Sequence, residues 1–141
     1  MAILPHLKGS ELAWRWAELP GDVQRQLHAF DQTESLLADV RSREFFDERG
    51  VRPPLVQAAL RGTEDAAGVA PWLRSQLAGD EMVTASWGAR TALLLPWPLF
   101  CEHWMTFCYP SSDDVIVWPA SEHWAVCHRH VGRFEIARRA A

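Results

Sequence analysis

The hydrophobic residues in positions 1–79 recur at helical spacing. Four stripes are separated by helix-ending or helix-capping residues, such as Leu19-Pro20-Gly21 and Pro53-Pro54. The stripes run through Leu12, Trp16 and Leu19, through Val23, Leu27 and Phe30, through Leu36, Leu37 and Val40, and through Leu55, Val56, Ala59 and Leu60. Trp14 and Arg15 lie off the first stripe. The pattern therefore predicts a helical first half, with Phe45-Phe46 as an aromatic anchor in a charged segment.

After Asp80 the pattern changes to short runs typical of strands. These runs are 82–87, 90–95, 115–118, 124–130 and 133–137, and residues 98–107 between them carry Phe100, Trp104 and Phe107 at helical spacing. The sequence predicts an α+β fold: a helical N-terminal half packed on a mostly antiparallel sheet of about five strands, with one inserted aromatic helix. We expect residues 1–141 to form a single domain, with a helical part at 1–79 and a sheet part at 80–141.

The last two strands predict a hairpin with Val131-Gly132 as its two-residue turn. In that register His128 faces Glu135, and both share a polar face with His130. Cys127 then shares the apolar face with Phe134.

Composition narrows the class of protein. The 141 residues include eight Trp and three Cys, and the net charge is −4. Neither half is basic, which disfavours a nucleic-acid surface, and no apolar run is long enough to predict a membrane span. The start lacks a signal-peptide pattern, and three Cys do not suit a disulfide framework, so we expect a cytoplasmic protein with reduced thiols.

Several segments resemble a known family pattern. They are Trp14-Arg-Trp16 with Leu19-Pro20, Trp97-Pro-Leu-Phe-Cys-Glu-His-Trp-Met-Thr-Phe107, Asp113-Asp114-Val-Ile-Val117 and Phe134-Glu-Ile136. Together they resemble an uncharacterised bacterial family, the domain of unknown function 2947, mainly over the last third of the chain. The resemblance implies an aromatic helix, an Asp-Asp turn and a closing β-meander. It implies no activity.

The histidines and cysteines define an alternative site. His103, His128, His130 and Glu135 are the residues that a small-molecule or metal-dependent enzyme would use. Zinc needs ligands that converge tetrahedrally, and the chain has neither a Cys-x-x-Cys pair nor a His-Glu-x-x-His helix. We therefore expect no metal, no cofactor and no catalytic residue, with the cysteines acting as small buried hydrophobic residues.

The function favoured by these features is binding of a protein. A small, acidic, Trp-rich domain without a catalytic motif is typical of toxin-neutralising immunity proteins, which occlude a protein partner that is often basic. The predicted contact residues are Asp113, Asp114, Trp118, Glu122 and Trp124. Turn chemistry is the alternative for Asp113 and Asp114, because Asp side chains accept hydrogen bonds from nearby backbone N–H groups. The sequence does not determine the partner, the oligomeric state or the packing of residues 1–50.

Overall fold

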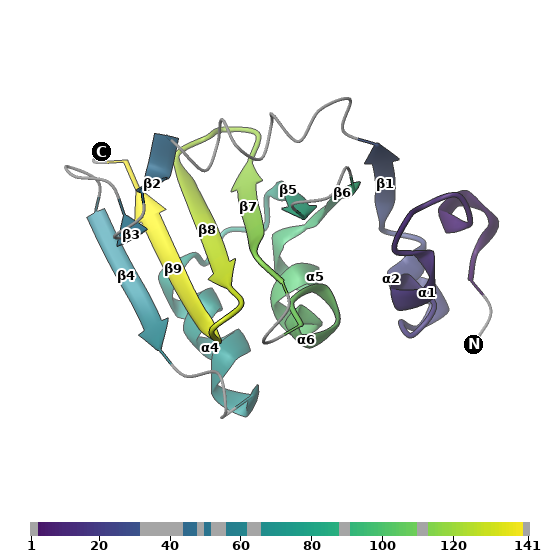
Figure 1. Cartoon of the computed structure of the whole chain (residues 1–141), viewed down its shortest axis with the longest axis horizontal. Helices are drawn as coiled ribbons and strands as arrows, with labels where there is room; N and C mark the ends of the chain where they lie inside the picture. Colours follow the sequence, from purple (N-terminus) through teal and green to yellow (C-terminus); the bar gives the residue numbers. More distant parts are fainter. Residues whose placement is uncertain are drawn as a thin grey trace.

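The computed structural model describes residues 3–31, 44–47, 50–51, 56–61, 66–87, 91–109 and 113–139. It is an α+β structure built on a seven-stranded antiparallel sheet, with the order β1-β6-β5-β7-β8-β9-β4 (Figure 1). The strands are β1 (His28–Asp31), β4 (Val56–Arg61), β5 (Met82–Trp87), β6 (Thr91–Pro96), β7 (Val115–Pro119), β8 (Trp124–Arg129) and β9 (Arg133–Arg138). The predicted class and antiparallel pairing are confirmed, but the sheet has two strands more than the predicted five.

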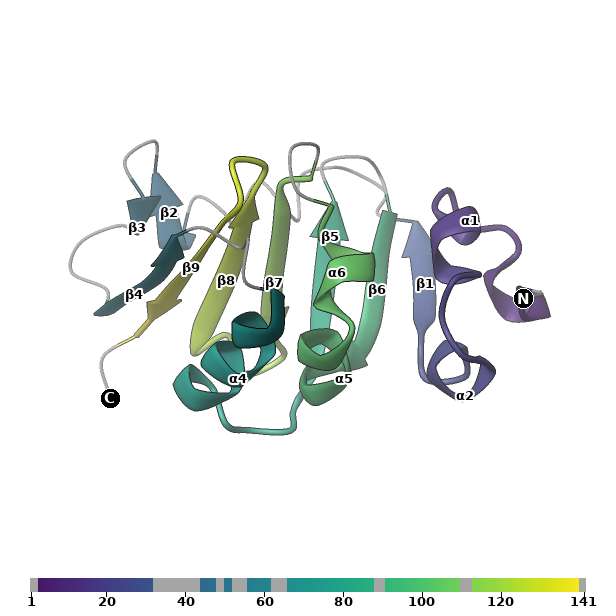
Figure 2. The same cartoon turned by 90° about the horizontal axis from the view of Figure 1, so that it is seen from below.

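Helices cover one face of the sheet. Figure 2 shows α4 (Ala66–Gln76), α5 (Trp97–Glu102) and α6 (Trp104–Phe107) together on this face. The N-terminal elements η1 (Pro5–Leu7), α1 (Ala13–Trp16) and α2 (Gly21–Gln24) lie beyond strand β1, at one end of the sheet. None of the helices in the described residues has the length and hydropathy needed to cross a lipid bilayer.

The main core lies between this face and the helices. Trp104, one of the three aromatic residues at helical spacing in residues 98–107, is 3% exposed, and its ring meets Phe134 edge-on at 5.7 Å. Trp97 stacks on Phe100 at 5.6 Å and donates its indole N–H to the Leu77 carbonyl. The buried aromatic side chains therefore join the helix layer to the sheet, and full burial of such rings contributes strongly to stability.

A smaller core lies on the second face of the sheet. Phe45 and Phe46 pack there against Ile116, Trp118, Ala125, Cys127 and Ala137. Phe46 belongs to β2 (Phe46–Asp47), which pairs with β3 (Gly50–Val51) in a separate two-stranded sheet. The aromatic anchor predicted at Phe45-Phe46 is thus buried, over strands β7, β8 and β9.

The prediction that residues 1–79 are helical is wrong in four described segments, which are the short strands β2 and β3 given above and two longer strands. Residues 28–31 form β1 and residues 56–61 form β4, the two edge strands of the sheet. In β4, Ala58 and Leu60 are half-buried against the main core while Ala59 is exposed. That alternation has a period of two, so pairing with β9 overrides the helical spacing of the apolar residues. The helix predicted around Leu36, Leu37 and Val40 lies outside the described residues.

Two helical segments differ in whether they are continuous. The aromatic helix predicted at 98–107 is split into α5 and α6 at His103, whose backbone φ of −111° and ψ of 25° departs from helical geometry. By contrast, residues 66–76 form one helix, α4, although Pro71 lies inside it.

The predicted register of the last hairpin is wrong by one residue. His128 pairs with Phe134, and Cys127 pairs with Glu135. The loop contains His130 as well as Val131 and Gly132, and Gly132 has a φ of 79°, which closes the hairpin with an N–H bond to the Arg129 carbonyl. Because side chains alternate between faces, this shift moves His128 to the main-core face and Cys127 to the second face.

Candidate functional site

Asp113 is largely occupied by structural contacts. Its carboxylate Oδ2 lies 2.6 Å from Nη1 of Arg15 and accepts a hydrogen bond of 2.9 Å from the Tyr109 backbone N–H. The Asp113 side chain is 12% exposed, and that of Arg15 is 6% exposed. Asp113 therefore ties the connection after α6 to helix α1, and little of its charge faces solvent.

Asp114 faces solvent, with 65% of its side chain exposed. Its Oδ1 accepts a hydrogen bond from the His130 backbone N–H at 3.0 Å and lies 3.1 Å from Nδ1 of the same histidine. Desolvation acts to raise the pKa of Asp114, but the hydrogen bonds and charge of His130, together with the charge of Arg129, outweigh it and lower the pKa. Asp114 thus fastens the β8–β9 loop through a residue 16 positions away, and not through a backbone group of its own turn.

The other predicted contact residues do not share a surface with these two aspartates. Trp118 and Trp124 are each 8% exposed, and they belong to different cores on opposite faces of the sheet. Glu122 has a φ of 57°, and its carbonyl accepts a hydrogen bond from Nε of Arg139. The described residues therefore do not bring the five predicted contact residues together as one binding face.

His128 is 1% exposed in the main core, where its ring lies 4.9 Å from that of Phe134. Its Nδ1 lies 3.0 Å from the Asp113 carbonyl, which can only accept, so Nδ1 carries the proton. Desolvation lowers the pKa of His128 from 6.5, as does the nearby His130, and the Asp113 carbonyl and the Asp113 and Asp114 charges oppose this only in part.

The alternative histidine site is not assembled. Glu135 lies on the face opposite His128, where Arg129 and Arg133 form ion pairs with its carboxylate. His130 is in the exposed hairpin loop, and His103 is half-buried at the end of α5. Among the described residues, no group of three or more His, Cys, Asp or Glu side chains converges as a metal site.

The three cysteines are free and buried, as expected. Desolvation raises the pKa of Cys101 to about 12 and that of Cys127 to about 12, and it raises the pKa of Cys108 well above its ordinary value. A thiol that stays protonated near neutral pH is a poor nucleophile and a poor metal ligand. These cysteines therefore behave as packing residues.

A surface that the sequence analysis did not select is formed around Trp14. This side chain is 59% exposed, and its ring meets Tyr109 at 6.1 Å in an edge-to-face arrangement. Beneath the two rings, the Arg15 guanidinium lies 3.7 Å from the Tyr109 ring centroid and 5.4 Å from that of Trp14. Arg15 is fixed in turn by Asp113. The exposed Trp14 ring is thus packed against two side chains, Tyr109 and Arg15, that are held in place by other contacts.

Two exposed carboxylates flank helix α1, which carries Trp14. Glu11 accepts a hydrogen bond of 3.0 Å from the Thr91 hydroxyl, and Glu18 accepts one of 3.3 Å from the Tyr109 hydroxyl. Desolvation and then the Glu18 charge raise the pKa of Tyr109, so this hydroxyl stays a donor at neutral pH. We call Trp14, Tyr109, Glu11 and Glu18 the acidic-aromatic surface. The only sequence signal for it was the position of Trp14 off the apolar stripe of its helix.

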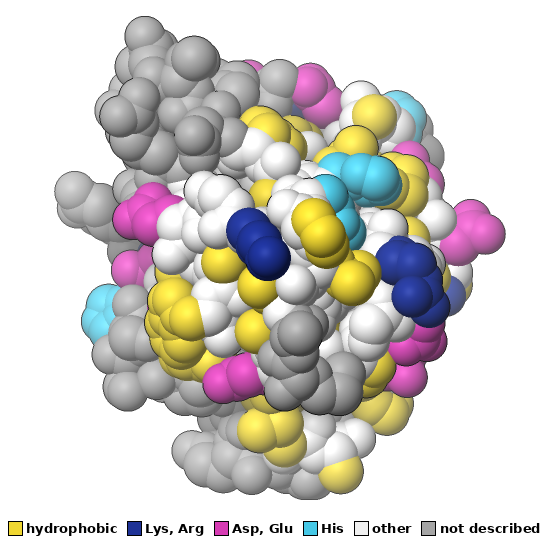
Figure 3. Space-filling model, turned by 90° about the vertical axis from the view of Figure 1, so that its right-hand side faces the viewer, with side chains coloured by type: hydrophobic (Ala, Val, Ile, Leu, Met, Phe, Trp, Pro, Cys, Tyr) yellow, Lys and Arg dark blue, Asp and Glu magenta, His cyan; other side chains and the backbone are white. Residues whose placement is uncertain are grey.

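The side of the molecule that carries α1, α2 and β1 is shown in Figure 3. Hydrophobic side chains reach the surface across the described part of this side, and acidic side chains lie mainly toward its edges.

Comparisons with known proteins return no match of any kind. No family model, no curated protein and no solved structure matches the chain.

Proposed function

We propose that this protein is a non-enzymatic binding protein that docks on a basic protein partner through the acidic-aromatic surface. The observation that carries the proposal is Trp14, an exposed tryptophan held by Tyr109 and by the Arg15–Asp113 ion pair. Tryptophan, tyrosine and arginine are the residue types most enriched among interface hot spots.

The contacts that fix the Trp14 side chain favour high affinity for the partner. A side chain that is already fixed loses little conformational entropy on binding, and that loss otherwise costs about 0.5–1.5 kcal/mol for each mobile side chain. Arg15 is 5% exposed and neutralised by Asp113, so it supports the ring without presenting a positive charge to the partner. Burying Trp14 in a complementary pocket would then remove much of its apolar area from water.

The negative charge of this protein favours a basic partner. Glu11 and Glu18 are both exposed and flank helix α1, which carries Trp14, and the whole chain has a net charge of −4. Opposite charges around an aromatic anchor speed diffusional encounter and exclude acidic competitors. A toxin-neutralising immunity protein of the bacterial cytoplasm works in this way, by covering a basic active site, and we propose this class for the protein by analogy.

The test uses an aromatic photo-crosslinking amino acid at position 14, which keeps a ring in place of the Trp14 indole, with the same amino acid at position 131 as control. Val131 is 69% exposed in the β8–β9 loop, outside the acidic-aromatic surface. A protein in host lysate that is crosslinked at position 14 and not at position 131 is identified as the partner and is then purified. Trp14→Ala should weaken its binding by about 2–4 kcal/mol, whereas Val131→Ala should leave binding unchanged.

Charge is tested on the same purified pair. Glu11→Gln with Glu18→Gln should slow association at low salt and have less effect at high salt, because exposed charges are screened over about 8–10 Å. Equal affinity of wild type and Trp14→Ala for the partner would refute this site. If the double Gln variant associates with the partner at the wild-type rate in low salt, the electrostatic part of the proposal is refuted.

A further inference from the structure

His128 is a buried histidine that holds the residue on which the acidic-aromatic surface depends. It is 1% exposed, and its Nδ1–H donates to the backbone carbonyl of Asp113 at 3.0 Å. The Asp113 carboxylate lies 2.6 Å from the Arg15 guanidinium and accepts from the Tyr109 backbone N–H at 2.9 Å. Arg15 in turn lies against the rings of Tyr109 and Trp14. Asp113 therefore joins the two aromatic residues of the surface, and His128 fixes Asp113 from inside the core.

The second ring nitrogen of His128 lies in an apolar environment. Nε2 is buried, and no polar atom of the described residues forms a hydrogen bond with it. The residues paired with His128 on the neighbouring strands are Val115 and Phe134, both buried and apolar. The neutral ring leaves only a lone pair without a partner. A proton on Nε2 would create a cation with an unpaired N–H in this site, which is strongly unfavourable.

The charged groups that face the ring only partly offset this penalty. The carboxylates of Asp113 and Asp114 favour the cation, His130 disfavours it, and desolvation outweighs them, so the pKa of His128 is lowered. Three further ionisable residues nearby are either neutral or on the opposite face of the sheet, namely Cys108, Arg129 and Glu135. The folded protein thus keeps His128 neutral only while the ring remains enclosed.

A protonated His128 competes with Arg15 for Asp113. To reach the Asp113 carboxylate or solvent, the ring has to displace Asp113, whose carbonyl is bonded to it and whose side chain is 12% exposed. Displacement of Asp113 breaks its ion pair with Arg15 and its hydrogen bond from the Tyr109 N–H. Helix α1 stays anchored, because its Trp16 is 0% exposed in the main core. The change is therefore local to the contacts of Asp113.

We propose that His128 is an acid-sensitive switch: the neutral ring holds Asp113 in place, and the protonated ring releases Asp113 from Arg15 and Tyr109. The released form binds the proton more readily than the closed form, so release is favoured as the pH falls below about 6.5, the ordinary value for histidine. Acid then takes apart the contacts that fix Trp14. An effect of acid on partner binding rests on the proposed function, whereas the switch is a property of the free protein.

Amide hydrogen exchange followed by NMR tests the switch at the Tyr109 N–H, because its acceptor is Asp113. After correction for the intrinsic exchange rate, its protection factor should fall about tenfold between about pH 7.5 and about pH 5.5, since only the released form takes up the proton. Carboxyl groups ordinarily titrate near about pH 4, below this window. The protection factor should also stay below those of β5, a strand that is paired on both sides.

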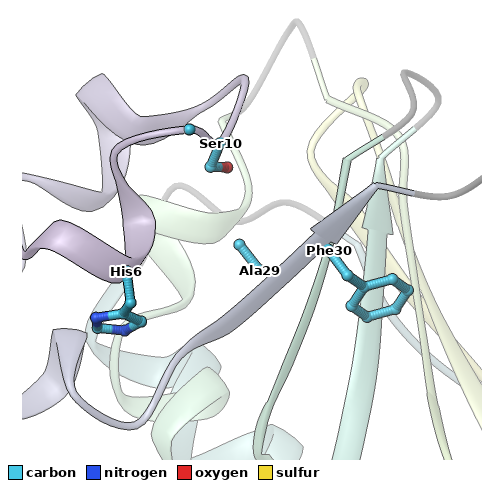
Figure 4. A pocket seen from close by; sticks show the side chains of 5 residues that line it. His6, Ser10, Ala29 and Phe30 are labelled. Carbon is cyan, nitrogen blue, oxygen red and sulfur yellow. The ribbon is translucent and has the colours of Figure 1, made fainter.

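Two variants assign the titrating group. His128→Gln keeps an N–H for the Asp113 carbonyl and cannot take up a proton, so the protection of Tyr109 should no longer depend on pH. His6→Gln is the matched control. Figure 4 shows His6 beside a pocket of about 220 Å³ between β1 and the segment that links η1 to α1. His6 is exposed, and its Nε2 donates to two backbone carbonyls whether or not the ring is charged, so this variant should keep the wild-type profile.

The wild-type profile alone can overturn the inference, even if a variant fails to fold. A protection factor of Tyr109 that does not change with pH would do so. Protection of Tyr109 equal to that of β5 at both pH values would also do so, because Asp113 would then be released only when the whole protein unfolds. A pH dependence that persists in His128→Gln would assign the proton to another group. Partner binding that is unaffected by Trp14→Ala would change none of these results, so the two proposals fail separately.

Discussion

The ion pair between Arg15 and Asp113 makes a sharp prediction about stability. Asp113→Asn keeps the shape of the side chain and removes its charge. The Asn oxygen can still accept the hydrogen bond from the Tyr109 N–H, which is 2.9 Å long in the native protein. What is lost is the negative charge opposite the Arg15 guanidinium, whose side chain is 6% exposed and therefore keeps its own charge in a poorly solvated site.

The magnitude follows from burial. Removing one partner of a buried ion pair costs about 3–5 kcal/mol, because the remaining charge is left uncompensated. The 12% exposure of the Asp113 side chain gives water some access, and the Tyr109 ring at 3.7 Å still stabilises the cation, by about 0.5–2 kcal/mol. We therefore expect Asp113→Asn to lower the free energy of unfolding by about 2–4 kcal/mol.

Urea denaturation followed by tryptophan fluorescence measures this loss. Asp114→Asn is the matched control, since Asp114 is 65% exposed and its pair with His130 should be worth less than about 1 kcal/mol. Arg15→Met combined with Asp113→Asn should recover part of the stability that Asp113→Asn loses, because no buried charge then lacks a partner. Equal unfolding midpoints for Asp113→Asn and Asp114→Asn would refute the reasoning.

Two further predictions concern the main core. Trp104→Ala should lower the free energy of unfolding by about 3–5 kcal/mol, because Trp104 is 3% exposed between α6 and Phe134; an unchanged urea midpoint would contradict this. The pKa of His128 is lowered from 6.5, so the unfolded chain binds a proton that the folded chain resists, and stability should fall as the pH drops below about 6.5. His128→Gln should flatten the stability curve from about pH 6.5 down to about pH 5, and parallel curves for the two proteins would contradict the assignment.

The strands of the C-terminal half were predictable from sequence because their signals are local. Runs such as Met82–Trp87 and Trp124–Arg129 have apolar, β-branched and aromatic residues bounded by turn residues. Val56–Arg61 carries no such signal, and its conformation depends on pairing with Arg133–Arg138 far along the chain. Local spacing favours a helix there, and only the tertiary partner reverses it.

The candidate site was harder to predict for the same reason. Asp113 and Asp114 are adjacent in sequence and were treated as one acidic turn, yet Arg15, 98 residues away, makes them different. Asp113 becomes a buried structural anion, and Asp114 remains on the surface. Likewise, one added residue in the β8–β9 loop separates His128 from Glu135. Pairings across the fold and the conformation of one glycine loop are not encoded in residue spacing.

The strand order also has a consequence for biosynthesis. The five central strands, in the sheet order β6-β5-β7-β8-β9, come from the C-terminal half and pair in sequence with one another. The two outer strands, β1 and β4, come from the N-terminal half. Translation delivers these outer strands first, but β1 must wait for β6, and β4 must wait for β9. The strands β1 and β4 of the nascent N-terminal half thus leave the ribosome before their partners in the C-terminal half, so a holdase chaperone should bind this half during synthesis.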